Sequence, residues 1–202
     1  CGIAALLEGI CMLGMEQAYP EAFAARVYKI SRDAQGNRLT HVKITGGKLK
    51  VRDLLTNQTK GKGAEACWEE KVSQIRIYSG ASFRSVNEVQ AGQICALTGL
   101  NHTHSGEGLG AERDSELPVL EPVLSYQICL PDDCDVHQTY RKLLQLEEEE
   151  PELHIAWNEK KNEIYAQLMG EVQIEVLKNM IRERFGIAVE FGTGSIVYKE
   201  TI

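Results

Sequence analysis

The sequence predicts two domains, an all-β antiparallel barrel followed by an α+β domain of the ferredoxin-like β-α-β-β-α-β type. Three observations support this fold class. Residues 24–110 hold short segments of alternating polar and apolar residues separated by glycine, which is typical of a barrel. In residues 122–202, two segments with apolar residues at helical spacing alternate with apolar strands. Residues 111–121 are polar and aperiodic, which indicates a linker.

Composition places the chain among ordinary globular proteins. It has 202 residues, of which 43% are hydrophobic and 25% charged, enough for one or two domains with their own cores. No apolar run approaches the ~18 residues of a membrane span. Six cysteines form no Cys-x-x-Cys pair, so we expect reduced thiols in a cytoplasmic protein, without a disulfide framework or a zinc site. Because the chain begins with Cys1 rather than Met, we expect it to be a piece of something longer.

The first half is expected to begin with a helix and to continue in strands. Residues 2–10 place Ile3, Leu6, Leu7 and Ile10 on one side of a short helix, and we assign residues 1–23 to this helix and a connector. Alternation and turn residues then predict the barrel strands, at 25–30, 38–44, 48–53, 71–78, 83–89 and 93–97.

The second half is expected to hold helices at 136–149 and 171–185. Its strands are predicted at 123–130, 153–157, 163–168 and 187–191. In the second helix Val172, Val176 and Met180 form an apolar stripe, so we expect Val176 to face the sheet near Ile128 and Leu168. Four glutamates at 147–150 end the first helix, where they oppose the helix dipole, so we expect them to be solvated.

Charge is distributed unevenly along the chain. Residues 1–118 carry 14 Lys and Arg against 13 Asp and Glu, whereas residues 119–202 carry 8 against 16. Within the first half, residues 24–62 hold ten basic residues and only two acidic ones. A local positive excess is typical of a surface that binds phosphate, although a β-domain with lysines on its outer strands would look similar.

No catalytic or cofactor-binding motif stands out. The chain has neither a Gly-x-x-x-x-Gly-Lys-Ser/Thr phosphate loop nor an Asn-Lys-x-Asp guanine pocket, so we do not expect it to bind or hydrolyse nucleotide. His102 and His104 lack a third ligand at metal-site spacing. The glycines at 106–110 lack the strand-to-helix setting of a dinucleotide fingerprint. We therefore expect no catalytic residue, no bound cofactor and no metal.

Several sequence segments resemble those of elongation factor G-type translational GTPases. Gly170-Glu171-Val172-Gln173-Ile174-Glu175 is similar to the Gly-Glu-Leu-His-Leu-Glu motif of the family's domain III. Residues 25–51 and 89–94 resemble its domain II, and 197–202 resemble its Val-x-Tyr-Arg-Glu-Thr-Ile phrase. Gln173 departs from the usual His, a departure that the branch of tetracycline-resistance ribosomal protection proteins shares.

The resemblance covers nearly the whole chain and implies its role. Residues 1–23 would end the GTPase domain, 24–110 would be domain II and 122–202 domain III, in a monomer that binds no membrane. The partners would be the small ribosomal subunit, through its RNA and protein, and the parent's GTPase domain, where GTP and magnesium bind. The residues expected to contact ribosomal RNA phosphates, as positioning contacts, are Lys43, Lys48, Lys50, Arg52, Arg76, Ser79, Ser82 and Arg84.

Three readings stay open at this point. The parent would be a protection protein that removes tetracycline from the decoding site, or elongation factor G itself, which drives translocation. Gln173 and the short connector favour the first. The third reading is an independent module, either an enzyme with a pocket between the domains or a small-molecule-binding domain, but fold alone does not confer such chemistry.

Overall fold

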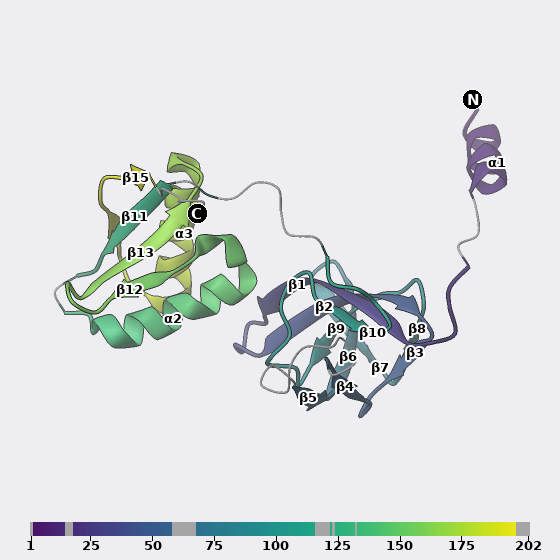
Figure 1. Ribbon diagram of the computed structural model, residues 1–202. Coiled ribbons are helices and arrows are strands. Elements are labelled where there is room, and N and C mark those ends of the chain that lie inside the picture. Colours follow the sequence, from purple (N-terminus) through teal and green to yellow (C-terminus); the bar gives the residue numbers. More distant parts are fainter. Residues whose placement is uncertain are drawn as a thin grey trace, which may run out of the picture.

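The protein consists of a helix, a β-domain and an α+β domain, in that order along the chain (Figure 1). The computed structural model describes residues 2–14, 18–57, 68–115, 122, 124–131 and 133–196. The predicted fold class is confirmed. Three parts of the sequence predictions lie outside the described residues: most of the 111–121 linker, the 197–202 phrase, and Lys60 and Lys62 of the basic segment.

The β-domain is an antiparallel barrel. A six-stranded sheet runs in the order β10-β1-β2-β9-β6-β7, and two ribbons, β3–β8 and β4–β5, complete the domain. Every pairing among its described strands is antiparallel. The strands are β1 (Ala24–Arg32), β2 (Arg38–Gly46), β3 (Lys48–Lys50), β4 (Leu54–Thr56), β5 (Glu69–Lys71), β6 (Gln74–Ser79), β7 (Ser82–Val86), β8 (Glu88–Gln90), β9 (Ile94–Thr98) and β10 (Gly108–Gly110).

The barrel strands differ from the predicted ones at their ends. β1 and β2 extend beyond the predicted 25–30 and 38–44. The strand predicted at 48–53 ends at Lys50, because the Asp53 carboxylate accepts a hydrogen bond from the Lys50 amide at 2.7 Å and Arg52 has a φ of 75°. A non-glycine residue in this left-handed conformation belongs to a turn. The predicted segments 71–78 and 83–89 are each divided between two sheets. β4 and β10 were not predicted.

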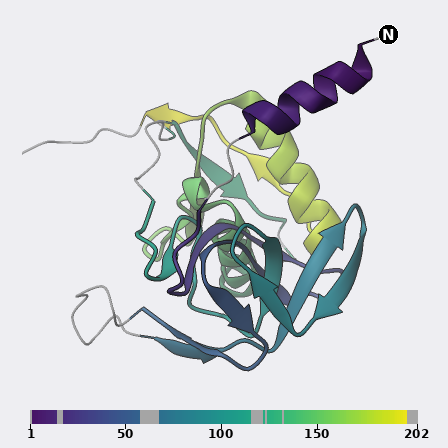
Figure 2. The same cartoon turned by 90° about the vertical axis from the view of Figure 1, so that its right-hand side faces the viewer.

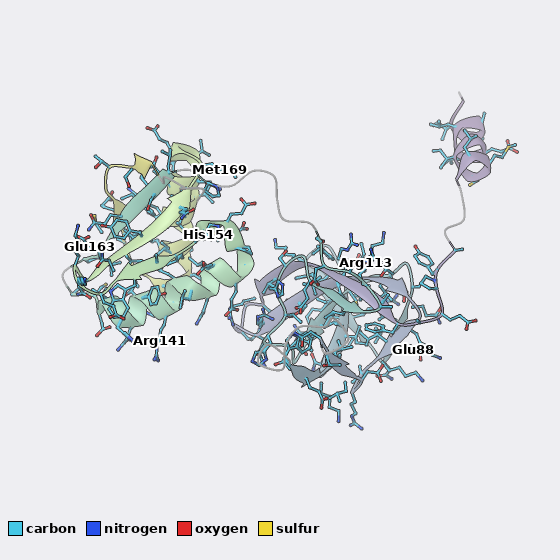
Figure 3. The ribbon with its side chains drawn as sticks, viewed as in Figure 1. Glu88, Arg113, Arg141, His154, Glu163 and Met169 are labelled. Atoms are coloured by element: carbon cyan, nitrogen blue, oxygen red, sulfur yellow. The ribbon has the colours of Figure 1, made fainter. Side chains whose placement is uncertain are left out.

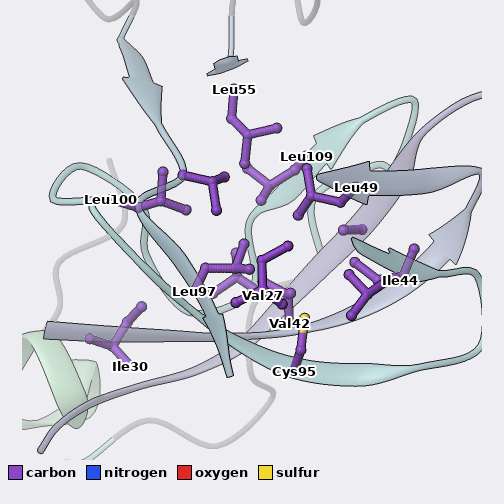
Figure 4. Packing of buried hydrophobic residues seen from close by; sticks show 14 residues of the cluster. Val27, Ile30, Val42, Ile44, Leu49, Leu55, Cys95, Leu97, Leu100 and Leu109 are labelled. Atoms are coloured by element: carbon purple, nitrogen blue, oxygen red, sulfur yellow. The ribbon is translucent and has the colours of Figure 1, made fainter. Parts of the chain in front are cut away.

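The barrel core is a single apolar cluster. In Figure 2 the strands curve round one interior, and Figure 4 shows the side chains that fill it. Alternate residues of β1 and β2 point inwards, among them Val27, Val42 and Ile44, all fully buried. Cys95 joins them, and burial raises the pKa of its thiol to about 12. The four described cysteines are free thiols.

The α+β domain has the predicted β-α-β-β-α-β order. Its sheet runs β12-β13-β11-β14, and a short fifth strand, β15, also pairs with β11. Buried residues of both helices and alternate residues of β11 and β13 form one core, so both helices cover the same face. The elements are β11 (Leu124–Cys129), α2 (Val136–Glu149), a 3-10 turn η3 (Pro151–Leu153), β12 (Ala156–Asn158), β13 (Glu163–Leu168), α3 (Glu171–Phe185), β14 (Glu190–Phe191) and β15 (Ser195–Ile196).

The prediction that Val176 faces the sheet is wrong. Val176 is 52% exposed, whereas Leu177 and Ile181 are buried. α3 carries two adjoining apolar rows, and the row that begins at Ile174 packs on the sheet. Because the two rows lie side by side on the helix, periodicity located the helix without deciding which row is buried.

The prediction that the glutamates at 147–150 are simply solvated is also wrong for three of them. Glu147 accepts a hydrogen bond from the Ile155 amide at 3.2 Å, and burial raises the pKa of its carboxyl. Glu149 is paired with Arg184 at the end of α3, whose guanidinium pKa this hydrogen bond raises. Glu148 reaches across to the barrel, where it meets Arg32 and Arg38. The arginines offset the unfavourable position of the acidic run at a helix C-terminus.

The N-terminal helix stands apart from both domains. α1 (Ile3–Leu13) begins one residue after the predicted start at Gly2 and ends three residues beyond the predicted end at Ile10. Its apolar side chains are exposed, including those of Ile3, Leu6, Leu7 and Ile10, and Figure 1 shows it away from the barrel. None of the helices in the described ranges combines the length and apolar character that crossing a membrane requires.

Candidate nucleic-acid interface

Every charged residue in the strands of the barrel's six-stranded sheet is basic. None of its strands contains Asp or Glu, so the charge of the sheet itself is positive. Carboxylates outside these strands pair with four of the basic side chains: Asp33 and Glu112 lie next to the strands, and Glu148 belongs to α2. The basic residues of the sheet are Arg26, Lys29, Arg32, Arg38, Lys43, Arg76 and Arg84.

Lys43 and Arg84 are the most available of the predicted contacts in this sheet. Both side chains are exposed, on β2 and β7 respectively. Neither forms an ion pair with a carboxylate in the described part of the chain. An unpaired surface cation can contact a phosphate without first breaking an internal bond.

Arg76, by contrast, is built into the barrel. It is only 9% exposed, and its Nη1 donates to Asp33 Oδ2 at 2.9 Å. Its Nε and Nη2 both donate to Gln74 Oε1. The expectation that Arg76 presents its charge at the surface is therefore corrected, because Asp33 takes up that charge inside the domain.

Asp33 organises the turn between β1 and β2. Besides Arg76, it accepts hydrogen bonds from the Gln35 and Asn37 amides and from the Asn37 side chain. The hydrogen bonds from Arg76 and then from Asn37 lower the pKa of Asp33 to about 2. The Asp33–Arg76 pair therefore persists through the neutral and mildly acidic range.

The other predicted contacts lie in two places. Ser79 and Ser82 form the exposed tip of the β6–β7 hairpin, where the Ser82 hydroxyl donates to the Ser79 carbonyl oxygen at 3.1 Å. Lys48 and Lys50 lie on β3, and their Nζ atoms are 4.0 and 3.4 Å from Glu88, which Figure 3 labels on the barrel. Arg52 lies in the turn after β3 and is exposed.

The loop that holds His102 and His104 is fixed by two carboxylates. Glu70 accepts hydrogen bonds from the Asn101 and His102 amides and from His102 Nδ1 at 2.9 Å. Burial alone would raise the pKa of Glu70, but these hydrogen bonds together lower it. The fully buried Glu107 accepts from the His104 amide at 3.2 Å. No three potential ligands converge on a metal position within the described residues.

A polar hollow of about 460 Å³ opens beside this loop. Two guanidinium groups line it, those of Arg38 and Arg76. Both are already paired, with Glu148 and Asp33 respectively. Among the described residues that line the hollow, neither guanidinium is therefore free to bind an anionic small molecule.

The residues of the 170–175 motif shape the start of α3. Gly170 precedes the helix and Glu171 lies in its first turn, where a negative charge suits the helix dipole. The Gln173 side chain turns back and accepts a hydrogen bond from the Met169 amide at 2.6 Å. Glu175 is exposed. In this chain the motif has a structural role at the helix N-terminus.

Sequence reasoning missed a group of rings on the outer face of the six-stranded sheet. Tyr28, His41, Tyr78 and Phe83 lie in series, with ring centroids 6.0, 6.1 and 5.3 Å apart. We call them the aromatic row. They come from β1, β2, β6 and β7, and an alternation that places aromatic residues at the polar positions of strands was the available signal.

Two family models match the chain. The model described as "Elongation factor G domain 2" matches residues 22–111, and the model described as "Elongation Factor G, domain III" matches residues 119–193. Together they cover most of the 202 residues.

Curated relatives and a solved structure agree with these models. A tetracycline resistance protein, TetP, of Clostridium perfringens is 32% identical over 99% of this chain and 30% of its own length. Elongation factor G of Amoebophilus asiaticus is 27% identical over 90% of this chain and 25% of its own length. A crystal structure of a Thermus thermophilus protein shares the fold with a TM-score of 0.73 and 21% identity, over 95% of this chain and 29% of that one. The chain thus spans under a third of these relatives.

Proposed function

The chain belongs to the elongation factor G family, whose domains II and III it carries, and on this premise we propose that it is the ribosome-docking part of a translational GTPase. The observation that supports docking most directly is the six-stranded sheet, which carries seven basic and no acidic residues. Such a surface attracts the dense phosphate of ribosomal RNA.

Within this proposal, the barrel contacts RNA of the small subunit. Lys43 and Arg84 make phosphate contacts, and the exposed Ser79–Ser82 tip allows a close approach of the backbone. These contacts fix position and carry no sequence code. The second half, with 16 acidic against 8 basic residues from 119 onwards, is directed to ribosomal protein. The Glu148 contacts with Arg32 and Arg38 give the two domains a route by which a nucleotide state is relayed.

For the whole protein we propose ribosomal protection against tetracycline. The support is the 32% identity to TetP over 99% of the chain, against 27% over 90% for the elongation factor G cited above, together with Gln173. Translocation by elongation factor G itself is the alternative. Because the chain spans under a third of these relatives, GTP hydrolysis, magnesium binding and a cytoplasmic location are likewise proposed of the whole protein.

The test is sedimentation of the chain with purified small ribosomal subunits. We expect Lys43→Glu with Arg84→Glu to weaken association about tenfold or more, and each lost phosphate contact to lower the log–log salt slope by about 0.7–0.9. The matched control is Lys160→Glu with Lys161→Glu, which reverses two exposed lysines in the β12–β13 turn. Equal effects of the two double reversals would contradict docking through the barrel. In the whole protein, GTP binding should be unaffected by either.

A further inference from the structure

We propose that the aromatic row, Tyr28, His41, Tyr78 and Phe83, is a stacking surface for unpaired RNA bases. This inference rests on the proposed function, in that RNA meets this sheet, and it names the part of RNA that the sheet binds. The phosphate contacts proposed above need only charge. The aromatic row adds a surface that distinguishes single-stranded from double-stranded RNA.

Three of the four rings are exposed although each is large and largely apolar. Phe83 is 48% exposed, Tyr28 47% and Tyr78 37%. Tyr78 stands on the outer face because the strands alternate: Ile75 on β6 is fully buried in the core, so Tyr78, three residues later, points to the opposite face. There it faces Phe83 across the β6–β7 ladder. Aromatic residues placed on the wet face of a sheet are typical of proteins that stack nucleic-acid bases.

The local structure brings the rings close together. An irregularity of β1 between Val27 and Lys29 inserts Tyr28 at the edge of the row. Ala96 of β9 pairs with His41 on one side and with Arg76 on the other, and its small side chain lets the His41 and Tyr78 rings approach across it. The Ser31 hydroxyl forms a hydrogen bond with His41 Nε2 at 2.8 Å. Burial first, and the charge of Lys29 second, lower the pKa of His41.

The charges on this face suit a nucleic-acid strand. Lys29 lies beside His41 in the β1–β2 ladder, and Lys43 follows two residues later on β2. Arg76 places its guanidinium carbon 4.5 Å from the centroid of the Phe83 ring. Asp33 already takes up the charge of Arg76, so the cations available to the phosphates of a bound strand are Lys29 and Lys43, on strands that contain no Asp or Glu. A duplex offers phosphates alone, because its bases are already stacked on one another.

The same rings also form cross-strand pairs that stabilise a sheet, so the experiment must separate binding from folding. The 202-residue chain is titrated with a single-stranded RNA of about ten nucleotides that contains 2-aminopurine, and with an RNA duplex of about 16 base pairs. Stacking on a ring quenches 2-aminopurine. We expect quenching and tighter binding of the single strand by the parent chain. With Phe83→Leu, we expect no quenching and an affinity for the single strand about tenfold lower. The affinity for the duplex should not change.

Three controls make the result specific. Phe83→Trp should restore quenching, whereas an apolar packing role would be filled equally well by leucine. Tyr165→Leu removes a ring in the acidic half of the chain and should change neither RNA affinity. Denaturation of each variant in urea confirms that it is folded. Unchanged quenching and affinity in folded Phe83→Leu, or no binding of the single strand by the parent, overturns the proposal.

The outcomes for this inference and for the proposed function are distinct. If Phe83→Leu sediments with small ribosomal subunits and binds single-stranded RNA as the parent does, the stacking surface is refuted and the docking proposal stands. If single-stranded RNA binding depends on Phe83 but the parent chain does not associate with the subunits, docking is refuted and the stacking surface is supported.

Discussion

The Glu148 carboxylate at the end of α2 lies between two arginines of the barrel, with Oε2 2.9 Å from Arg32 Nη2 and 3.1 Å from Arg38 Nε. Arg38 is fixed from the other side. Its Nη1 donates to the Leu100 carbonyl oxygen at 2.8 Å and to the Thr103 hydroxyl at 3.0 Å. One glutamate of the second domain therefore contacts the same arginine that holds the 100–103 loop of the first.

We expect Glu148→Gln to loosen the two domains without unfolding either. Glu148 is 41% exposed, so the pair is screened and contributes no more than about 0.2–1 kcal/mol to stability. Residual dipolar couplings should fit one alignment tensor for both domains in the parent chain and two tensors in the variant. Glu150→Gln, in the same acidic run, is the control. A single shared tensor in Glu148→Gln would show that other contacts fix the angle.

The Asp33–Arg76 pair should make stability depend on acid pH. The pKa of Asp33 is lowered to about 2 in the folded chain, against about 3.9 for an unfolded aspartate. The folded state therefore favours the carboxylate, so the stabilisation is complete above the unfolded value and is lost as pH falls through about 2. The free energy of unfolding of the parent should exceed that of Asp33→Asn most at neutral pH, with the difference shrinking below about pH 4.

Arg76→Gln provides the check on that assignment. With the guanidinium removed, the hydrogen bond that contributes most to the low pKa of Asp33 is gone. The difference between Arg76→Gln and the double variant with Asp33→Asn should then depend on pH much less. An equally strong pH dependence in the Arg76→Gln background would mean that the Asn37 hydrogen bonds, rather than Arg76, hold the carboxylate.

The two apolar rows of α3 should respond differently to truncation. Leu177 is 3% exposed, so Leu177→Ala removes buried methyl groups and leaves a cavity, at a cost of about 2–5 kcal/mol. Val176→Ala should change stability by no more than about 0.5 kcal/mol, since that side chain faces solvent. Urea unfolding of both variants measures the contrast. Comparable losses would mean that both rows are covered.

Gln173 should stabilise the start of α3 through its side-chain oxygen. Gln173→Ala removes the acceptor of the Met169 amide and should cost about 0.5–1.5 kcal/mol, the net value of one hydrogen bond. Gln173→Glu keeps an acceptor and adds a charge that suits the helix N-terminus, so it should be at least as stable as the parent. Thermal unfolding tests both, with Glu175→Ala as a control on the same helix.

The sequence predicted the elements whose signals are local. α2, α3 and β13 have the predicted bounds, because clear periodicity and clear ends lie within each segment. β10 was not predicted, because Gly108–Gly110 shows no alternation and becomes a strand only through its pairing with β1. The burial of Arg76 depends on Asp33, 43 residues earlier, and the pairing of Glu148 depends on a second domain. Such partners are chosen by tertiary structure, which single-residue patterns do not encode.

The candidate site, like the fold, was predicted only in part. Lys43 and Arg84 lie at polar positions of alternating strands, and both are exposed in the structure, whereas their contact with RNA stays a prediction. The aromatic row was missed because its members come from four strands that are neighbours only in the folded sheet. Each ring alone is an ordinary surface residue. Their significance arises when the ladder brings them within about 6 Å of one another.

The place of β11 in its sheet has a mechanical consequence. β11 is the first strand of the α+β domain, and it lies between β13 on one side and β14 and β15 on the other. A pull that arrives from the barrel along the chain therefore acts on a strand that is hydrogen-bonded on both sides. An edge strand would be held by one ladder only. Under tension the α+β domain should swing as a rigid body before any of its strands separates.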